Sequence, residues 1–183
     1  RLEAWRQLGS RELNDCKSFH EAIKEYRLHR EGKLVPTWRS LILLLMTFLE
    51  KPNDRESLRS YQRSHWGSSS GETCVIELSG LAARNLNAPR DRESFREERI
   101  TKIRERLNEN NSTVKLVVMY GRTRKESWEK IAGRTFPPDG ILTSGTTIIA
   151  HTPAPVAFGL TNEYWEELGL LLRNKAKSFG TRS

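Results

Sequence analysis

Residues 146 to 169 read TTIIAHTPAPVAFGLTNEYWEELG, and they place a strand, a histidine and a helix in close succession. Residues 146–150 favour extended structure, and a helix is expected to begin near Thr161. His151 and Thr152 therefore follow the carboxyl end of a strand, which is where open α/β sheets hold their ligands. His151 is thus a candidate functional residue. The alternative is that it only closes the strand and bonds a neighbouring carbonyl group.

Two further strands and a series of helices are expected on similar grounds. The strands are residues 73–79 (TCVIELS) and 114–120 (VKLVVMY), and a glycine follows each of them. Apolar residues at helical spacing predict helices over residues 2–8, 18–32, 36–49, 54–65, 91–108, 125–132 and 162–175.

The alternation of strands and helices favours parallel crossover connections. The predicted fold class is therefore α/β, as a three-layer α/β/α sandwich with a short, mainly parallel central sheet. A length of 183 residues suits one domain. Its amino-terminal helical region would span residues 1–66, and its strand-helix core residues 73–172.

The composition favours a globular protein with an anionic partner. The chain has 31 Lys and Arg against 23 Asp and Glu, which gives a net charge of +8. Excess positive charge favours nucleic acid over an anionic membrane, although it can also serve solubility alone. The most apolar run, residues 41–49, is too short to cross a bilayer, so no membrane contact is expected.

Cysteine and histidine usage predicts no metal site. Cys16 and Cys74 lie far apart in the sequence, and the four histidines show no ligand spacing. We therefore expect no zinc and no disulfide, which suits a reducing cytoplasm. A monomer in the cytoplasm is the expectation.

Three polar steps would meet along one edge of the sheet if its strands run in parallel. We call this edge the rim, and its steps are Ser79-Gly80, Tyr120-Gly121 and His151-Thr152. Glycine directly after a strand lets the main chain approach a ligand closely. The rim is therefore suited to a flat polar ring or a phosphate.

Basic residues follow the first two strand ends on the same edge. They are Arg84, Arg90, Arg122, Arg124 and Lys125. At this position we expect them to contact phosphates. The alternative is a set of solvated loop residues, since arginine is common on protein surfaces.

The order of these motifs resembles the later part of the uracil-DNA glycosylase superfamily. The segments VIELSGLAARN, LVVMYG, TTIIAHTPAP and GLTNEYWEELG carry the resemblance, which covers residues 73–172. It implies DNA binding and hydrolysis of the N-glycosidic bond of a damaged or deaminated base, without cofactor or metal. It also implies that Ser79 reads the base edge, and that His151 donates a hydrogen bond to the carbonyl oxygen of the leaving base.

The resemblance also implies functions for the loop of residues 153–160 and for Glu77. The loop of residues 153–160 resembles the segment that wedges into a duplex when a base is flipped out, with Val156 or Phe158 as the wedge. The water-activating motif of the family is not found in residues 1–70, so Glu77 is a candidate general base. The alternative for Glu77 is a buried ion pair with an arginine such as Arg39.

Two other functions stay open. The missing water-activating motif is also compatible with an inactive module that keeps the glycosylase fold and binds nucleic acid or a nucleotide. An unrelated nucleotide-binding α/β enzyme would need a glycine-rich phosphate loop, and neither a GxGxxG nor a GKS/T sequence occurs.

Overall fold

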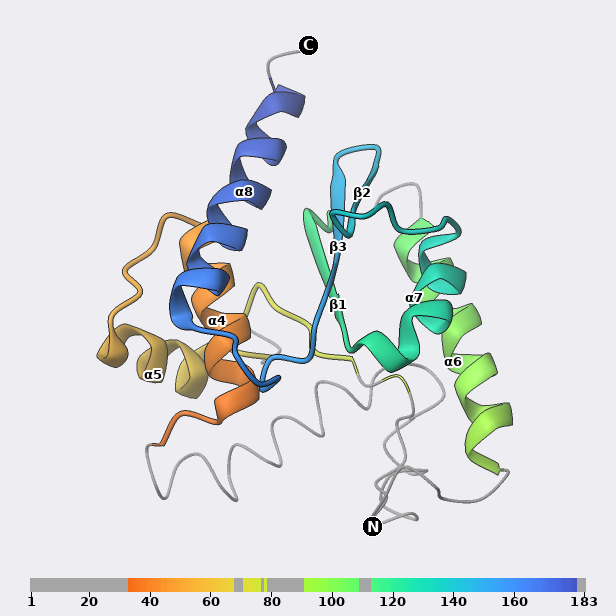
Figure 1. Cartoon of the computed structure of the whole chain (residues 1–183), viewed down its shortest axis with the longest axis horizontal. Coiled ribbons are helices and arrows are strands. Elements are labelled where there is room, and N and C mark those ends of the chain that lie inside the picture. The colour runs from red at the N-terminus through yellow and green to blue at the C-terminus, as the bar shows by residue number, and fades with distance from the viewer. Residues whose placement is uncertain (1–32, 68–70, 77, 79–90, 109–112, 181–183) are drawn as a thin grey trace. The chain divides into compact units, whose positions relative to one another are not determined.

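The computed structural model of the chain describes residues 33–67, 71–76, 78, 91–108 and 113–180 (Figure 1). The chain divides into two compact units. We call Gly32–Gln62 with Thr113–Ser183 the sheet unit, and Arg1–Glu31 with Arg63–Ser112 the helical unit. The helices predicted at residues 2–8 and 18–32 lie outside the described residues.

Three short strands form a mixed sheet in the sheet unit, and they are β1 (Leu116–Tyr120), β2 (Ile141–Ser144) and β3 (Thr147–Thr152). β3 lies in the middle, parallel to β1 and antiparallel to β2. The pairing of β1 with β3 confirms that the segments predicted at 114–120 and 146–150 run in parallel. The described sheet as a whole is mixed rather than mainly parallel, because β2 and β3 form a hairpin.

The sequence pattern does not predict β2. Its residues Ile141 and Leu142 are buried whereas Thr143 and Ser144 are exposed, so the strand lacks the alternation that marks a half-buried strand. The hairpin turns directly after β2, where Gly145 has φ +55°. Left-handed backbone in a tight hairpin turn favours glycine.

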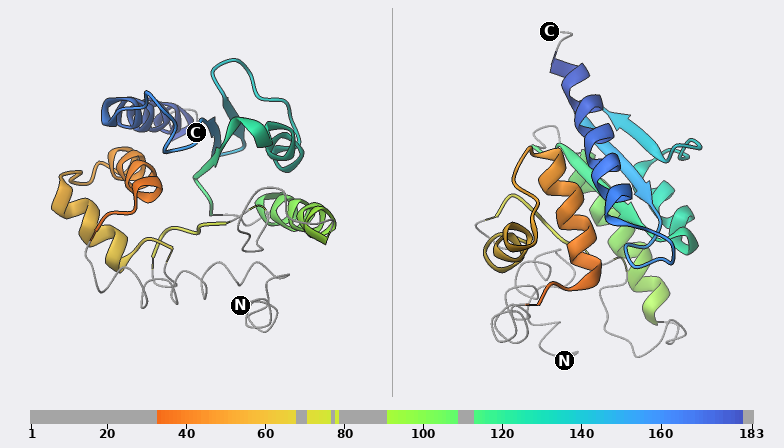
Figure 2. Two further views of the ribbon diagram at one scale, coloured as in Figure 1. Left: turned by 60° about the horizontal axis from the view of Figure 1, so that its bottom comes forward. Right: turned by 60° about the vertical axis from the view of Figure 1, so that its left-hand side comes forward.

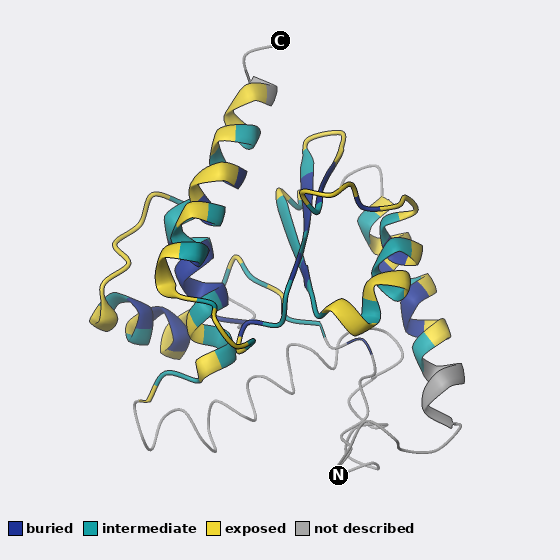
Figure 3. Cartoon of the chain, in the orientation of Figure 1, coloured by how far each residue is buried: buried dark blue, intermediate teal, exposed yellow. Residues whose placement is uncertain are grey.

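Two helices, α4 (Pro36–Phe48) and α8 (Asn162–Gly180), pack against each other in the sheet unit (Figure 2). Both confirm predicted helices, although α8 continues to residue 180 rather than ending near 175. A β-carbon at Gly169 of α8 would lie 2.7 Å from the Leu44 carbonyl oxygen. Glycine at this position therefore permits the close approach of the two helices. Figure 3 shows buried residues on α4 and on the strands.

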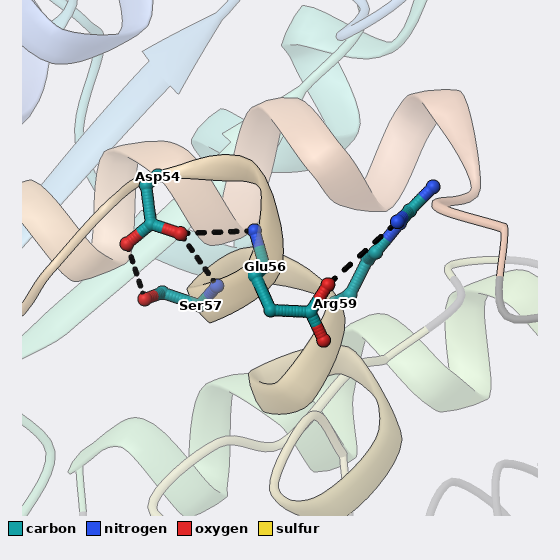
Figure 4. A network of polar contacts seen from close by, with 4 residues as sticks. All are labelled: Asp54, Glu56, Ser57 and Arg59. Carbon is teal, nitrogen blue, oxygen red and sulfur yellow. Dashed lines mark hydrogen bonds and ion pairs between the residues drawn. The ribbon is translucent and has the colours of Figure 1, made fainter.

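The sheet unit also contains α5 (Arg55–Ser64) up to Gln62, the 3-10 turn η3 (Arg122–Arg124) and α7 (Lys125–Ala132). Asp54 caps α5, because its Oδ1 accepts hydrogen bonds from the amides of Glu56 and Ser57 at 3.0 and 3.1 Å (Figure 4). Its Oδ2 accepts a third from the Ser57 hydroxyl. Such a cap satisfies amides that a helix start leaves unpaired. The predicted helices 54–65 and 125–132 are confirmed.

The helical unit contains α6 (Asp91–Asn108), which confirms the predicted helix at 91–108. The predicted strand 73–79 is wrong for residues 73–76 and 78, which form no strand. A local loop replaces it, since the Thr73 hydroxyl accepts a hydrogen bond from the Gly67 amide at 2.8 Å and donates one to the His65 carbonyl at 3.3 Å. Glu77 and Ser79 lie outside the described residues.

Candidate functional site

The carboxyl ends of β1 and β3 lie side by side and form the part of the rim that the structure describes. Tyr120 is the register partner of Thr152, and Met119 is the partner of His151. The Gly121 amide extends the ladder by donating to the Thr152 carbonyl at 3.0 Å. Two of the three predicted polar steps are therefore neighbours.

Gly121 gives the rim an open stretch of main chain. Its φ of +98° is a conformation that residues with a side chain rarely adopt, and no heavy atom lies within 4 Å of an added β-carbon. The chain turns there into η3. The space beside this glycine allows a ligand to approach the backbone closely.

His151 is half-buried, and both its ring and its main chain are held in place. In the Nε2–H tautomer the ring donates to the Gly121 carbonyl oxygen over 3.4 Å. This distance is long for an N–H···O bond. The ring centroid lies 5.1 Å from that of Phe136. The main-chain amide of His151 donates to the Gly140 carbonyl at 2.8 Å. The imidazole thus stays near the rim in a defined orientation with a weak, replaceable hydrogen bond.

The two residues paired across the rim differ in what they offer a ligand. Thr152 is only 2% exposed, and its hydroxyl donates to the Pro153 carbonyl at 3.0 Å. The Thr152 carbonyl already accepts the Gly121 amide, so both the hydroxyl and the carbonyl of this buried residue are engaged within the protein. Tyr120 is half-buried, and its carbonyl accepts the Trp128 indole N–H at 3.0 Å. Trp128 therefore supports the rim from α7.

Basic side chains follow β1 directly, as the sequence predicts. Arg122 and Lys125 are exposed and Arg124 is half-buried. The Lys125 Nζ lies 3.6 Å from Glu129 Oε1. Among the residues that the structure describes, no carboxylate pairs with Arg122 or Arg124. These two guanidinium groups are the stronger candidates for phosphate contacts, because binding would not first break an ion pair.

Tyr164 in the first turn of α8 belongs to this region, although the sequence motifs do not indicate it. Burial raises the pKa of the Tyr164 phenol, while the positive charge of Arg122 acts to lower that pKa. The phenol therefore stays neutral near pH 7, and it lies within the electrostatic range of Arg122. Its ring also meets the Trp165 ring edge-on, with centroids 5.1 Å apart.

The loop between β3 and α8 exposes two large apolar side chains. Val156 is 61% exposed, and the Phe158 side chain is fully exposed. The loop is fixed to α4, because the Ser40 hydroxyl donates to the Pro155 carbonyl at 3.2 Å. An exposed phenyl ring on an anchored loop is suited to insertion between stacked bases.

The remaining predicted site residues lie outside the described part of the chain. They are Glu77, Ser79, Gly80 and Arg84. The first polar step of the rim and the candidate general base are therefore not placed. Within the described ranges, no three His, Cys, Asp or Glu side chains gather as metal ligands would.

The chain matches no protein family, no curated protein and no solved structure with which it was compared. Of the helices in the described segments, none is both long enough and apolar enough to span a membrane.

Proposed function

We propose that this chain is a DNA-binding protein that recognises a base at the rim and hydrolyses its N-glycosidic bond, as the resemblance to uracil-DNA glycosylases implies. The observation that carries this proposal is the parallel pairing of β1 with β3. It brings the main chain of Tyr120 and Gly121 beside His151 at one sheet edge. Tyr120 pairs with Thr152, and its side chain is therefore on the opposite face of the sheet from that of His151. A three-layer α/β/α arrangement belongs to the same proposal.

Charge and exposure around the rim support DNA as the partner. Arg122 and Arg124 extend from η3 directly after β1, where they can neutralise phosphates on either side of a bound nucleotide. Phe158 lies on the loop that leaves β3. Its exposed ring would fill the gap in the base stack when a base moves out to the rim.

His151 would act on the leaving base. In the hydrolysis, the bond between the sugar C1′ and the base nitrogen breaks, a water oxygen bonds to C1′, and the water gives up a proton to the solvent. The base departs with the electron pair, and negative charge develops on its carbonyl oxygen. The Nε2–H of His151 would donate to that oxygen after giving up its long contact with the Gly121 carbonyl.

The decisive experiment compares excision with affinity in the His151→Ala variant. Single-turnover assays on oligonucleotides that contain uracil or hypoxanthine measure base release, and gel shifts measure binding. Loss of one preorganised donor should slow release by about 100-fold or more. DNA affinity should stay nearly unchanged, because Arg122 and Arg124 remain. Equal losses of rate and affinity would refute a catalytic His151.

A non-catalytic DNA-binding module is the second candidate. It is favoured by the engagement of the His151 ring with Gly121 and of the Thr152 hydroxyl with Pro153, which leaves fewer side-chain groups for chemistry. This function predicts that the wild-type chain binds abasic and uracil-containing oligonucleotides but releases no base. Substitution of Arg122 and Arg124 by alanine would still weaken that binding.

A further inference from the structure

A cavity of about 840 Å³ lies within the sheet unit, apart from the residues assigned to the rim steps. Its walls are α4, α5, the first turns of α8 and the loop that precedes α8. Each helix contributes residues three and four positions apart, such as Pro36, Arg39 and Ser40 of α4 and Arg55, Leu58 and Arg59 of α5. This spacing means that one continuous face of each helix lines the cavity.

The lining is strongly cationic. Four cationic side chains line the cavity against a single carboxylate, that of Glu166. Arg39 and Arg55 are exposed, and in the described part of the chain neither guanidinium has an ion-pair partner. The Glu166 carboxylate is itself occupied, because Asn53 Nδ2 donates to its Oε1 at 3.3 Å. The field in the cavity therefore favours an anion.

Arg59 adds a third guanidinium that is only partly satisfied. Its Nη1 lies 3.7 Å from Oε2 of the exposed Glu56 (Figure 4). Its Nε is buried, and no described group accepts a hydrogen bond from it. A buried N–H without an acceptor is costly, and an anionic oxygen is the acceptor that a guanidinium binds most strongly.

Hydrogen bonds hold the walls in place before any ligand arrives. The buried Gln62 of α5 accepts from the Val35 amide at 2.9 Å and donates to the Lys33 carbonyl at 3.0 Å. The bond from Ser40 to Pro155 fixes the loop to α4. The cavity is therefore preorganised, which reduces the entropy cost of binding.

The volume of the cavity and the polarity of its lining limit the class of ligand that it can bind. Ligand pockets usually measure about 300–1,000 Å³, and the volume of this cavity falls within that range. The cavity is therefore of a size for an organic ligand and is far larger than an inorganic phosphate requires. Apolar side chains with accessible surface line it as well, namely the exposed Pro36 and Val156 and the half-buried Leu160. A large organic anion fits both the cationic and the apolar side chains of the lining.

We propose that this cavity binds a phosphate-bearing ligand of nucleotide size. The guanidinium groups of Arg39, Arg55 and Arg59 hold the phosphate, and the sugar and base lie against the apolar wall. The ligand is either a free nucleotide or a unit of a single strand, because the loop of residues 153–160 connects β3 with the cavity wall. Neither source requires the rim to cleave a base.

The test uses the full 183-residue chain and calorimetric titration with thymidine 5′-monophosphate, thymidine and a ten-nucleotide oligothymidylate. The Arg39→Ala/Arg55→Ala variant should bind thymidine monophosphate about tenfold more weakly or worse, given the usual strength of charged hydrogen bonds. Both side chains are exposed, so the variant should keep the melting temperature of the wild type. Thymidine should bind much more weakly than its phosphate ester.

Arg63→Ala is the matched control. Arg63 is an exposed arginine of the same helix, but it does not line the cavity, so its replacement should leave affinity unchanged. If Arg122→Ala weakens binding of the mononucleotide whereas the Arg39→Ala/Arg55→Ala variant does not, the ligand binds at the rim and the proposal for the cavity is overturned. A result that refutes the function proposed for the rim can in this way be distinguished from a result that refutes ligand binding in the cavity.

The two sources give different results with the longer probe. Similar affinity for the mononucleotide and the oligonucleotide indicates a free nucleotide. Tenfold tighter binding of the oligonucleotide, abolished when Arg39 and Arg55 are replaced, indicates a strand. The proposal is overturned if no probe binds at millimolar concentration, if thymidine binds as well as its phosphate, or if Arg55→Ala and Arg63→Ala weaken binding equally.

Discussion

Gly140 and His151 lie so close together that a side chain cannot be accommodated at position 140. A β-carbon there would lie 2.6 Å from the His151 carbonyl oxygen, and Gly140 has φ +70°. Its own carbonyl accepts the His151 amide at 2.8 Å. The strand that carries the candidate functional histidine is thereby held from the β2 side as well as from β1.

Replacement of Gly140 by alanine should therefore destabilise the fold by about 1–3 kcal/mol, since a strained backbone and a main-chain clash act together. Urea denaturation measures the change in the free energy of unfolding. Gly145→Ala is the control, because Gly145 also has positive φ but has no atom within 4 Å of an added β-carbon. Equal destabilisation of the two variants would show that the contact with His151 contributes nothing.

Gly169→Ala tests the packing of α4 against α8. Alanine is favoured over glycine inside a helix by about 1 kcal/mol, so propensity alone predicts stabilisation. Its β-carbon, however, would lie 2.7 Å from the Leu44 carbonyl and 2.9 Å from the Thr47 β-carbon. Because backbone cannot move away cheaply, we expect a net loss of about 1–3 kcal/mol in chemical denaturation. Leu171→Ala, at an exposed position of the same helix, should be much milder. A stabilised Gly169→Ala variant would contradict the close packing.

The cap of α5 should make stability depend on pH. Hydrogen bonds from Ser57, first from its side chain and then from its amide, lower the pKa of Asp54 below its ordinary value of 3.8. A carboxylate with a lowered folded-state pKa stabilises the fold above the unfolded-state pKa. That contribution disappears as the pH falls through the folded-state value.

Thermal melts of wild type and Asp54→Asn between pH 6 and about pH 2 check this, because that range includes the ordinary pKa of 3.8. Asparagine keeps an oxygen acceptor for the cap but does not titrate. The difference in melting temperature between the two proteins should therefore shrink as the pH falls below 4. Parallel curves over the whole range would show that the Asp54 charge is irrelevant to stability.

Phosphate binding at the rim should be visible in the salt dependence of duplex binding. Removing one arginine that neutralises a phosphate should reduce the slope of log K against log salt concentration by about 0.9. Arg122→Ala and Arg124→Ala should each show this reduction in fluorescence anisotropy titrations. Arg134→Ala is the control, because Arg134 lies away from the rim. Its guanidinium donates to the Thr143 carbonyl, and Thr143 pairs with Ile148 near the start of β3, whereas the rim is at the end of that strand. A slope unchanged by all three substitutions would remove DNA from the proposed function.

Periodic features of the sequence predicted much of the described fold. α4 to α8 and the parallel pair β1 and β3 follow from apolar spacing, and the meeting of Tyr120 with Thr152 follows from parallel strands. β2 could not be predicted, because burial of two consecutive residues followed by two exposed ones resembles neither a strand nor a helix.

The site was less accessible to sequence reasoning than the fold. Polar residues after strands indicated the rim, but only the tertiary structure places Tyr164 within the electrostatic range of Arg122. The cavity depends on the consecutive helices α4 and α5 and on α8, which is distant from both in the sequence. Its cationic residues are each visible in the sequence, and Arg55 and Arg59 even share a helical face. Only the tertiary arrangement brings them to Arg39 of α4.

The central position of β3 has a consequence for engineering. A strand with hydrogen-bonded neighbours on both sides opens last, so its amides should exchange slowest within the sheet. The segment after it leaves this rigid base and is tied to α4 through the Pro155 carbonyl. The fold should therefore tolerate randomised sequences at residues 156–159. Variants with a changed binding preference could then be selected from such a library without redesign of the rest of the protein.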